Sequence, residues 1–172
     1  MKNRFYFGTA AMVLVLTMAF IGCGDGGGGP PPPGGNGLPD NLNTNNPGDT
    51  LVSSHDLPGA QLTEIMNAPG GGFAGWIVNG EGILQLYWTG RNATQCDAVV
   101  NAIKSTLSAT ETKAPLNTVL SGAQGSGTMR EATGTYKTVL KYSVIFAVTN
   151  LNAWGQNLPQ GTLVANFWDE SP

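Results

Sequence analysis

The sequence predicts an α+β domain over residues 57–172, with an antiparallel sheet of four to five strands and one main amphipathic helix packed on one face. Three sequence patterns support this prediction. Asn79-Gly80 separates two short runs rich in β-branched and aromatic residues, as in a β-hairpin. Residues 94–107 place apolar side chains at helical spacing, and residues 136–149 alternate between two faces as a strand does.

The first half of the domain is predicted to hold a helix and a hairpin. Apolar side chains recur on one side of residues 57–67, and Pro69-Gly70 would end a helix there. Residues 73–78 and 82–89 follow as two strands, joined by a type I′ turn at Asn79-Gly80.

The main helix is expected over residues 94–107. Thr94 precedes Asp97 by three residues, which resembles a capping box. One stripe of this helix is apolar and consists of Cys96, Val99, Val100, Ile103 and Leu107. Cys96 therefore points inward. No His or neighbouring cation supports a thiolate, so we interpret Cys96 as a small buried hydrophobic residue rather than a reactive group.

The second half is read mainly as strands. Residues 108–115 are expected to form a loop, while 116–121 fit either a helical turn or a strand, with the helix favoured. In the strand 136–149 one face is apolar throughout, whereas the other begins charged and turns apolar. This indicates that only half of the second face is covered.

Shorter strands complete the predicted sheet. A ragged strand is expected over 128–133 and a last strand over 162–168, after a loop rich in Asn and Gly at 150–161.

The N-terminus has the layout of a secretory signal peptide. Lys2 and Arg4 precede an uncharged segment, residues 5–22, with a dense apolar core. The segment ends in Phe20-Ile21-Gly22-Cys23, which resembles the lipobox of bacterial lipoproteins, although that family prefers Leu where Phe20 stands. An uncleaved signal anchor and a secretory peptide cut elsewhere are the alternatives, because residues 5–22 approach the minimum length for spanning a bilayer.

The resemblance implies cleavage before Cys23, which would carry a thioether-linked diacylglycerol and usually an amide-linked third acyl chain. Each buried CH₂ contributes about 0.8 kcal/mol, so such an anchor is effectively permanent. Gly24 is not the usual inner-membrane retention residue, so the outer membrane is favoured if the cell is Gram-negative.

Residues 24–56 are rich in Gly, Pro and Asn and are predicted to form a tether. A flexible chain of roughly 33 residues has a mean reach of about 30 Å. The predicted organisation is therefore a signal peptide (1–22), a lipidated Cys with its tether (23–56) and one globular domain (57–172).

The composition excludes some functions. Charged residues are 11% of the chain, and removal of residues 1–22 leaves 6 basic and 11 acidic side chains. The sequence therefore offers no basic patch for nucleic acid. Cys96 is the only thiol besides Cys23, so no disulfide within the domain is expected.

Motifs for catalysis or cofactors are weak. Ser54-His55-Asp56 holds three triad residue types, but consecutive side chains cannot form a relay. Residues 70–75 match G-x-G-x-x-G, yet a strand rather than a helix is predicted to follow, so we reject a dinucleotide site. No cofactor, zinc or calcium site is expected. The carboxylates are scattered at Glu64, Glu81, Asp97, Glu111, Glu131, Asp169 and Glu170.

One loop suggests binding. Trp154 lies between Asn152 and Gln156, where an aromatic face beside amide groups could stack on a sugar ring. The alternative is that Trp154 folds back to cover the sheet. We therefore expect a lipid-anchored cell-envelope protein, attached to the membrane through Cys23, whose non-catalytic domain binds an envelope protein or a glycan. An envelope hydrolase that uses the dispersed carboxylates is the alternative.

Overall fold

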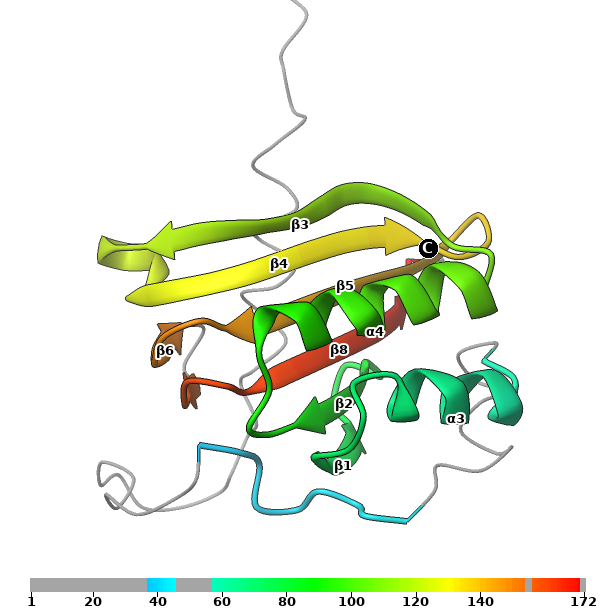
Figure 1. Cartoon of the computed structure of the whole chain (residues 1–172), viewed down its shortest axis with the longest axis horizontal. Helices are drawn as coiled ribbons and strands as arrows, with labels where there is room; N and C mark the ends of the chain where they lie inside the picture. The colour runs from blue at the N-terminus through cyan, green and yellow to red at the C-terminus, as the bar shows by residue number, and fades with distance from the viewer. Residues whose placement is uncertain (1–36, 46–56, 154–155, 171–172) are drawn as a thin grey trace, which may run out of the picture.

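The computed structural model describes residues 37–45, 57–153 and 156–170. Within these residues, six strands form one antiparallel sheet in the order β1-β2-β8-β5-β4-β3, and two helices pack on one of its faces (Figure 1). A two-stranded hairpin, β6–β7, forms a separate small sheet. The elements are α3 (Gly59–Asn67), β1 (Phe73–Val78), β2 (Leu84–Trp88), α4 (Ala93–Thr106), β3 (Thr110–Leu120), η1 (Gly122–Gln124), β4 (Gly127–Thr135), β5 (Leu140–Ala147), β6 (Leu151–Ala153), β7 (Gln156–Leu158) and β8 (Leu163–Asp169).

The predicted fold class is confirmed, but the sheet is larger than predicted. In the described chain it has six strands rather than four or five, and α3 lies beside α4 on the same face. The additional strand is β3. The loop expected over 108–115 is wrong from Thr110 onward, and for 116–121 the favoured helical turn is wrong whereas the alternative, a strand, is confirmed. Antiparallel pairing with β4, from Thr110↔Thr135 to Leu120↔Gly127, supplies backbone partners that outweigh the local helical pattern.

Helix α4 has a capping box, but at other residues than predicted. Asn92 is the N-cap: its Oδ1 accepts from the Gln95 amide at 3.0 Å, and Gln95 Oε1 accepts from the Asn92 amide at 3.1 Å. The helix thus begins before Thr94, because Asn caps a helix at least as well as Thr. Asp97 instead forms an ion pair with Arg130.

The β1–β2 hairpin is confirmed, but its turn is not type I′. The Asn79 amide donates to Ile83 O at 3.0 Å, which leaves a three-residue loop. Gly82 has a φ of 78°, whereas Gly80 and Glu81 do not have positive φ, and a type I′ turn needs positive φ at both central residues. The Asn79 side chain favours the longer loop by accepting from the amides of Glu81 and Ile83 at 3.0 and 2.9 Å.

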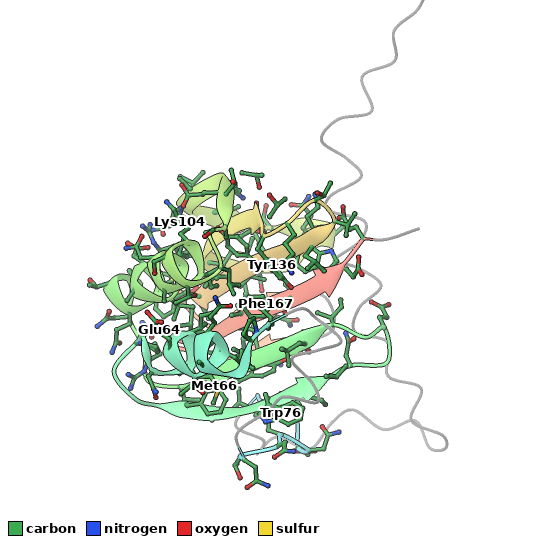
Figure 2. All side chains as sticks on the ribbon, turned by 90° about the vertical axis from the view of Figure 1, so that its right-hand side faces the viewer. Glu64, Met66, Trp76, Lys104, Tyr136 and Phe167 are labelled. Atoms are coloured by element: carbon green, nitrogen blue, oxygen red, sulfur yellow. The ribbon has the colours of Figure 1, made fainter. Side chains whose placement is uncertain are left out.

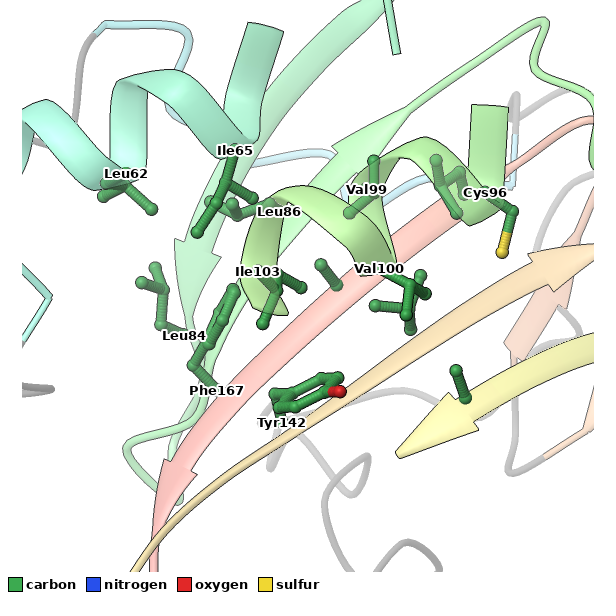
Figure 3. Packing of buried hydrophobic residues seen from close by; sticks show 14 of the residues in the cluster. Leu62, Ile65, Leu84, Leu86, Cys96, Val99, Val100, Ile103, Tyr142 and Phe167 are labelled. Atoms are coloured by element: carbon green, nitrogen blue, oxygen red, sulfur yellow. The ribbon is translucent and has the colours of Figure 1, made fainter. Parts of the chain in front are cut away.

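The helices cover one hydrophobic core. Val100 and Ile103 of α4 point toward Tyr142 and Phe167 on the sheet (Figure 3), and Cys96 is fully buried among them. Trp88 links this face to α3, because its Nε1 donates to Met66 O at 3.0 Å. Tyr136 and Phe167, labelled in Figure 2, make an edge-to-face contact with ring centroids 5.9 Å apart.

The opposite face of the sheet carries a second core. Strand β5 is shorter than expected, because residues 136–139 form a turn, but its alternation holds. Lys141 is half-buried, and Ser143, Ile145 and Ala147 are buried on this second face. Burial along this face therefore increases from Lys141 to Ala147, as the change from charged to apolar residues predicts. The apolar half packs against the β6–β7 hairpin through Leu151 and Leu158.

Residues 37–45, which we call the strap, complete this second core (cyan trace in Figure 1). Leu38 and Leu42 pack on the second core, although the sequence predicted a tether here. Asn43 forms two backbone hydrogen bonds with Trp76 at the β1 edge, of 2.8 and 2.9 Å, and Trp76 Nε1 donates to Asn45 O at 2.7 Å. Two leucines and an open strand edge thus hold a segment of otherwise polar composition.

The close packing of the strap against Gly75 predicts that the strap contributes to the stability of the fold. Gly75 has a φ of 143°, and a Cβ there would lie 2.8 Å from Asn43 O and 2.9 Å from Leu42 Cβ. Gly75→Ala is expected to displace the strap and lower the free energy of unfolding by about 1–3 kcal/mol in urea titrations. Gly80→Ala is the matched control, since nothing lies within 4 Å of a Cβ there, and it should change stability by less than about 0.5 kcal/mol. Equal effects from both variants would show that the strap does not stabilise the fold.

Candidate binding surface

The predicted binding loop is the β6–β7 hairpin. Its cross-strand pairs are Leu151↔Leu158, Asn152↔Asn157 and Ala153↔Gln156. Because cross-strand partners share a face, Asn152 and Asn157 point away from the main sheet and are exposed. Ala153 and Gln156 point toward it, and Ala153 is buried. The hairpin was not foreseen, because the sequence here is polar and the strands are only three residues long.

Glycines fix the hairpin on the sheet. Ser126 and Asn152 exchange two backbone hydrogen bonds of 2.8 and 2.9 Å. Gly125 and Gly127 flank this bridge with φ of 117° and 115°, and any Cβ at either position would collide with the hairpin backbone. Only glycine combines such positive φ angles with so close an approach of two backbone segments.

Gln156 belongs to a buried polar network rather than to the exposed surface. Its side chain hydrogen-bonds the Tyr87 hydroxyl. Tyr87 in turn donates to Gln85 Oε1 at 3.2 Å, and Gln85 Nε2 donates to Asn166 Oδ1 at 2.8 Å. Asn166 Nδ2 then donates to Ser143 Oγ at 3.0 Å. The last three side chains lie in register on β2, β8 and β5, so the network crosses the middle of the sheet.

The structure therefore separates the predicted binding residues. Asn152 faces outward and Gln156 faces the sheet, so they do not form one ligand contact. Trp154 and Cys23 lie outside the described residues. The residue that sequence reasoning missed is Asn157, which the cross-strand register places beside Asn152. Only the register reveals this pair, because the two residues are separated by the turn.

Exposed amides lie on both the hairpin and the strap. We call the exposed side chains of Asn41, Asn43, Asn152, Asn157 and Gln160 the amide face. Gly37 at the start of the strap lies against Asn157 and Pro159 of the hairpin, which joins the two parts. Residues 37–45 and 150–160 contain no Lys or Arg, and Asp40 is their only charged residue. Uncharged amides donate and accept hydrogen bonds, so this surface suits a neutral, hydroxyl-rich ligand.

The carboxylates that could serve catalysis are mostly paired with cations. In the described part of the chain four of the seven predicted carboxylates form ion pairs: Asp97 with Arg130, Glu111 with Lys104, Glu131 with Lys113, and Glu170 with Lys141. The Asp97 pair is bidentate, at 2.8 and 2.9 Å, and this hydrogen bonding raises the pKa of Arg130.

Burial keeps the thiol and phenols protonated. It raises the pKa of Cys96 to about 12, with a further rise from the charge of Asp97 and an opposing effect of Arg130. Burial likewise raises the pKa of Tyr142 to about 12. The pKa of Tyr87 also rises to about 12, although the hydrogen bond from Gln156 lowers it. The Cys96 thiol is therefore not a nucleophile at neutral pH.

Two features are absent from the described residues. Across 37–45, 57–153 and 156–170, no three His, Cys, Asp or Glu side chains come together as a metal site requires. Neither α3 nor α4 is long and apolar enough to cross a membrane.

Comparison with known proteins gives no similarity to report. No protein-family model matches the chain, and no curated protein or solved structure is significantly similar to it.

The buried phenols predict the alkaline behaviour of the domain. Tyr87, Tyr136 and Tyr142 are the only tyrosines of residues 23–172, and all three have a raised pKa. An unfolded chain loses its phenolic protons near pH 10, so the stability that neutral phenols provide is present below about pH 10 and is lost toward pH 12.

We expect absorbance at 295 nm to change little at pH 10 and then to rise together with the loss of circular dichroism. Ionisation of the phenols near pH 10 with an intact fold would contradict their burial.

Proposed function

We propose that the protein is a lipid-anchored cell-envelope protein whose folded domain is a non-catalytic binding module. The N-terminal sequence supports the proposed anchor. Lys2 and Arg4 precede an uncharged apolar segment, which ends in Gly22-Cys23 and is followed by a segment rich in Gly and Pro. The acyl chains on Cys23 would supply the attachment to the membrane. The outer membrane is the destination that Gly24 favours in a Gram-negative cell.

We propose an uncharged glycan of the envelope as the ligand class. The amide face supports this, because sugar hydroxyls pair with amide donors and acceptors without requiring a charge. Asn152 and Asn157 lie side by side on the hairpin part of this face. The envelope hydrolase has less support, since four of the dispersed carboxylates in the described chain are engaged by cations.

The anchor is tested by mass spectrometry of the native protein. We expect a mature N-terminus at Cys23 that carries the mass of a diacylglycerol and a further acyl chain, and partition of the protein into detergent. Cys23→Ala should lose the added mass and the retention in membranes, while circular dichroism of the domain stays unchanged. A mature N-terminus elsewhere, or an unmodified Cys23, would refute the anchor.

The ligand class is tested by titrating the domain with soluble, uncharged oligosaccharides, such as chains of N-acetylglucosamine, and following binding by calorimetry. Asn157→Ala is expected to weaken binding about tenfold, the effect of one or two lost hydrogen bonds. Asn101→Ala is the matched control, because Asn101 is an exposed amide on α4, across the sheet from the hairpin. An equal loss in both variants, or no binding by the unmodified domain, would refute the assignment.

A further inference from the structure

We propose that the folded domain stands on the membrane in one orientation, with the strap and the β6–β7 hairpin toward the bilayer and α3 and α4 away from it. This inference rests on the proposed anchor at Cys23. It adds which surface of the domain faces the lipid headgroups, and it implies that the proposed glycan reaches the amide face in the gap between the domain and the bilayer.

The strap determines where the tether leaves the domain. Gly37, the first described residue, lies against the backbone of Asn157 and the ring of Pro159 in the hairpin. Leu38 and Leu42 follow and pack into the second core, and Asn43 is bonded to the β1 edge. The chain from Cys23 therefore joins the domain on the face opposite the helices, and it joins at a position fixed by packing.

The remaining tether is short. Gly37 follows Cys23 by 14 positions in the sequence, not by the 34 positions that separate Cys23 from residue 57. A flexible chain of this length has a mean end-to-end distance of about 20 Å. Fully extended, it spans at most about 50 Å.

The domain is wider than the mean reach of this tether. A folded body of roughly 130 residues has a radius of gyration of about 14 Å, which corresponds to a sphere about 36 Å across. Because the bilayer is a plane, the shortest route around such a sphere from the strap face to the bilayer is a quarter of the circumference plus one radius, about 46 Å by the same estimate. This is more than twice the mean reach of the tether, so contact of the outer faces of α3 and α4 with the bilayer requires an almost fully extended tether and is strongly disfavoured.

Charge does not provide the orientation. The strap and hairpin carry Asp40 and no cation, and Lys141 on the same sheet face is paired with Glu170, so this surface offers little attraction to anionic headgroups. The cations Lys104 and Arg130 on the helix side are paired with Glu111 and Asp97. Orientation set by the length of the tether should therefore be insensitive to salt, whereas adsorption through basic side chains would weaken with salt.

Energy transfer to the membrane tests the orientation. Residues 23–172 are coupled through Cys23 to a maleimide lipid in phosphatidylcholine vesicles. Cys96 does not compete, because it is fully buried and its pKa is raised to about 12. A donor fluorophore is attached to a clickable non-natural residue in place of either Asn157 or Asn101, both exposed, and an acceptor dye is placed in the lipid.

We expect transfer at least about twofold stronger from position 157 than from position 101, because the tether holds the two at different heights. Insertion of about 40 Gly and Ser residues after Gly35 should abolish the difference, since the mean reach then rises to about 40 Å. Raising the salt concentration should leave the native-tether result unchanged.

Equal transfer from both positions with the native tether, stronger transfer from position 101, or a difference that disappears in high salt would overturn the orientation. Because the lipid is attached chemically, this result does not depend on whether the cell acylates Cys23. Mass spectrometry of the native protein tests that step separately.

Discussion

The central strands of the main sheet must be covered on both faces, and the rest of the structure follows from this requirement. Leu86, Val144 and Phe167 point to one side of β2, β5 and β8, and Tyr87, Ile145 and Val164 point to the other. A sheet that is apolar on both faces is stable only between two layers. The helices form one layer. The other layer is built from short, polar segments, the hairpin and the strap, which supply four leucines: Leu38, Leu42, Leu151 and Leu158.

The second face also contains the buried polar network of Tyr87, Gln85, Asn166 and Ser143. A buried amide is costly unless it is hydrogen-bonded, so these side chains favour the one strand register in which they meet. A shift of β8 by one residue would turn Asn166 into the helix-side core and Phe167 out of it. The network therefore specifies the order of the central strands as well as stabilising them.

Elements with a strong local pattern could be predicted from the sequence. Strand β1 was predicted to the residue, and the inward stripe of α4 was predicted because apolar residues recur at helical spacing over fourteen residues. Strand β3 was predicted only as the alternative for residues 116–121, because it exists through its pairing with β4 and its own pattern is interrupted by Pro115. The strap looked like tether, since only Leu38 and Leu42 distinguish it from the Gly- and Asn-rich residues around it.

The candidate site was predicted less well than the fold. An exposed Asn152 follows from the polarity of its segment. The inward direction of Gln156 and the pairing of Asn152 with Asn157 depend on the hairpin register, which no local pattern reveals. The hydrogen bond between Gln156 and Tyr87 also joins segments that are distant in the sequence.

The strap also determines how the domain responds to a pull. If Cys23 carries the proposed anchor, tension from the bilayer would enter the described domain at Gly37 and act first on the packing of Leu38 and Leu42 and on the two Asn43–Trp76 hydrogen bonds. The strands of the six-stranded sheet would then bear the force only after these contacts break. Release of residues 37–45 would lengthen the tether by up to about 30 Å. Under the proposed anchor, the strap that completes the second core would thus yield first and protect the main sheet from small displacements of the membrane.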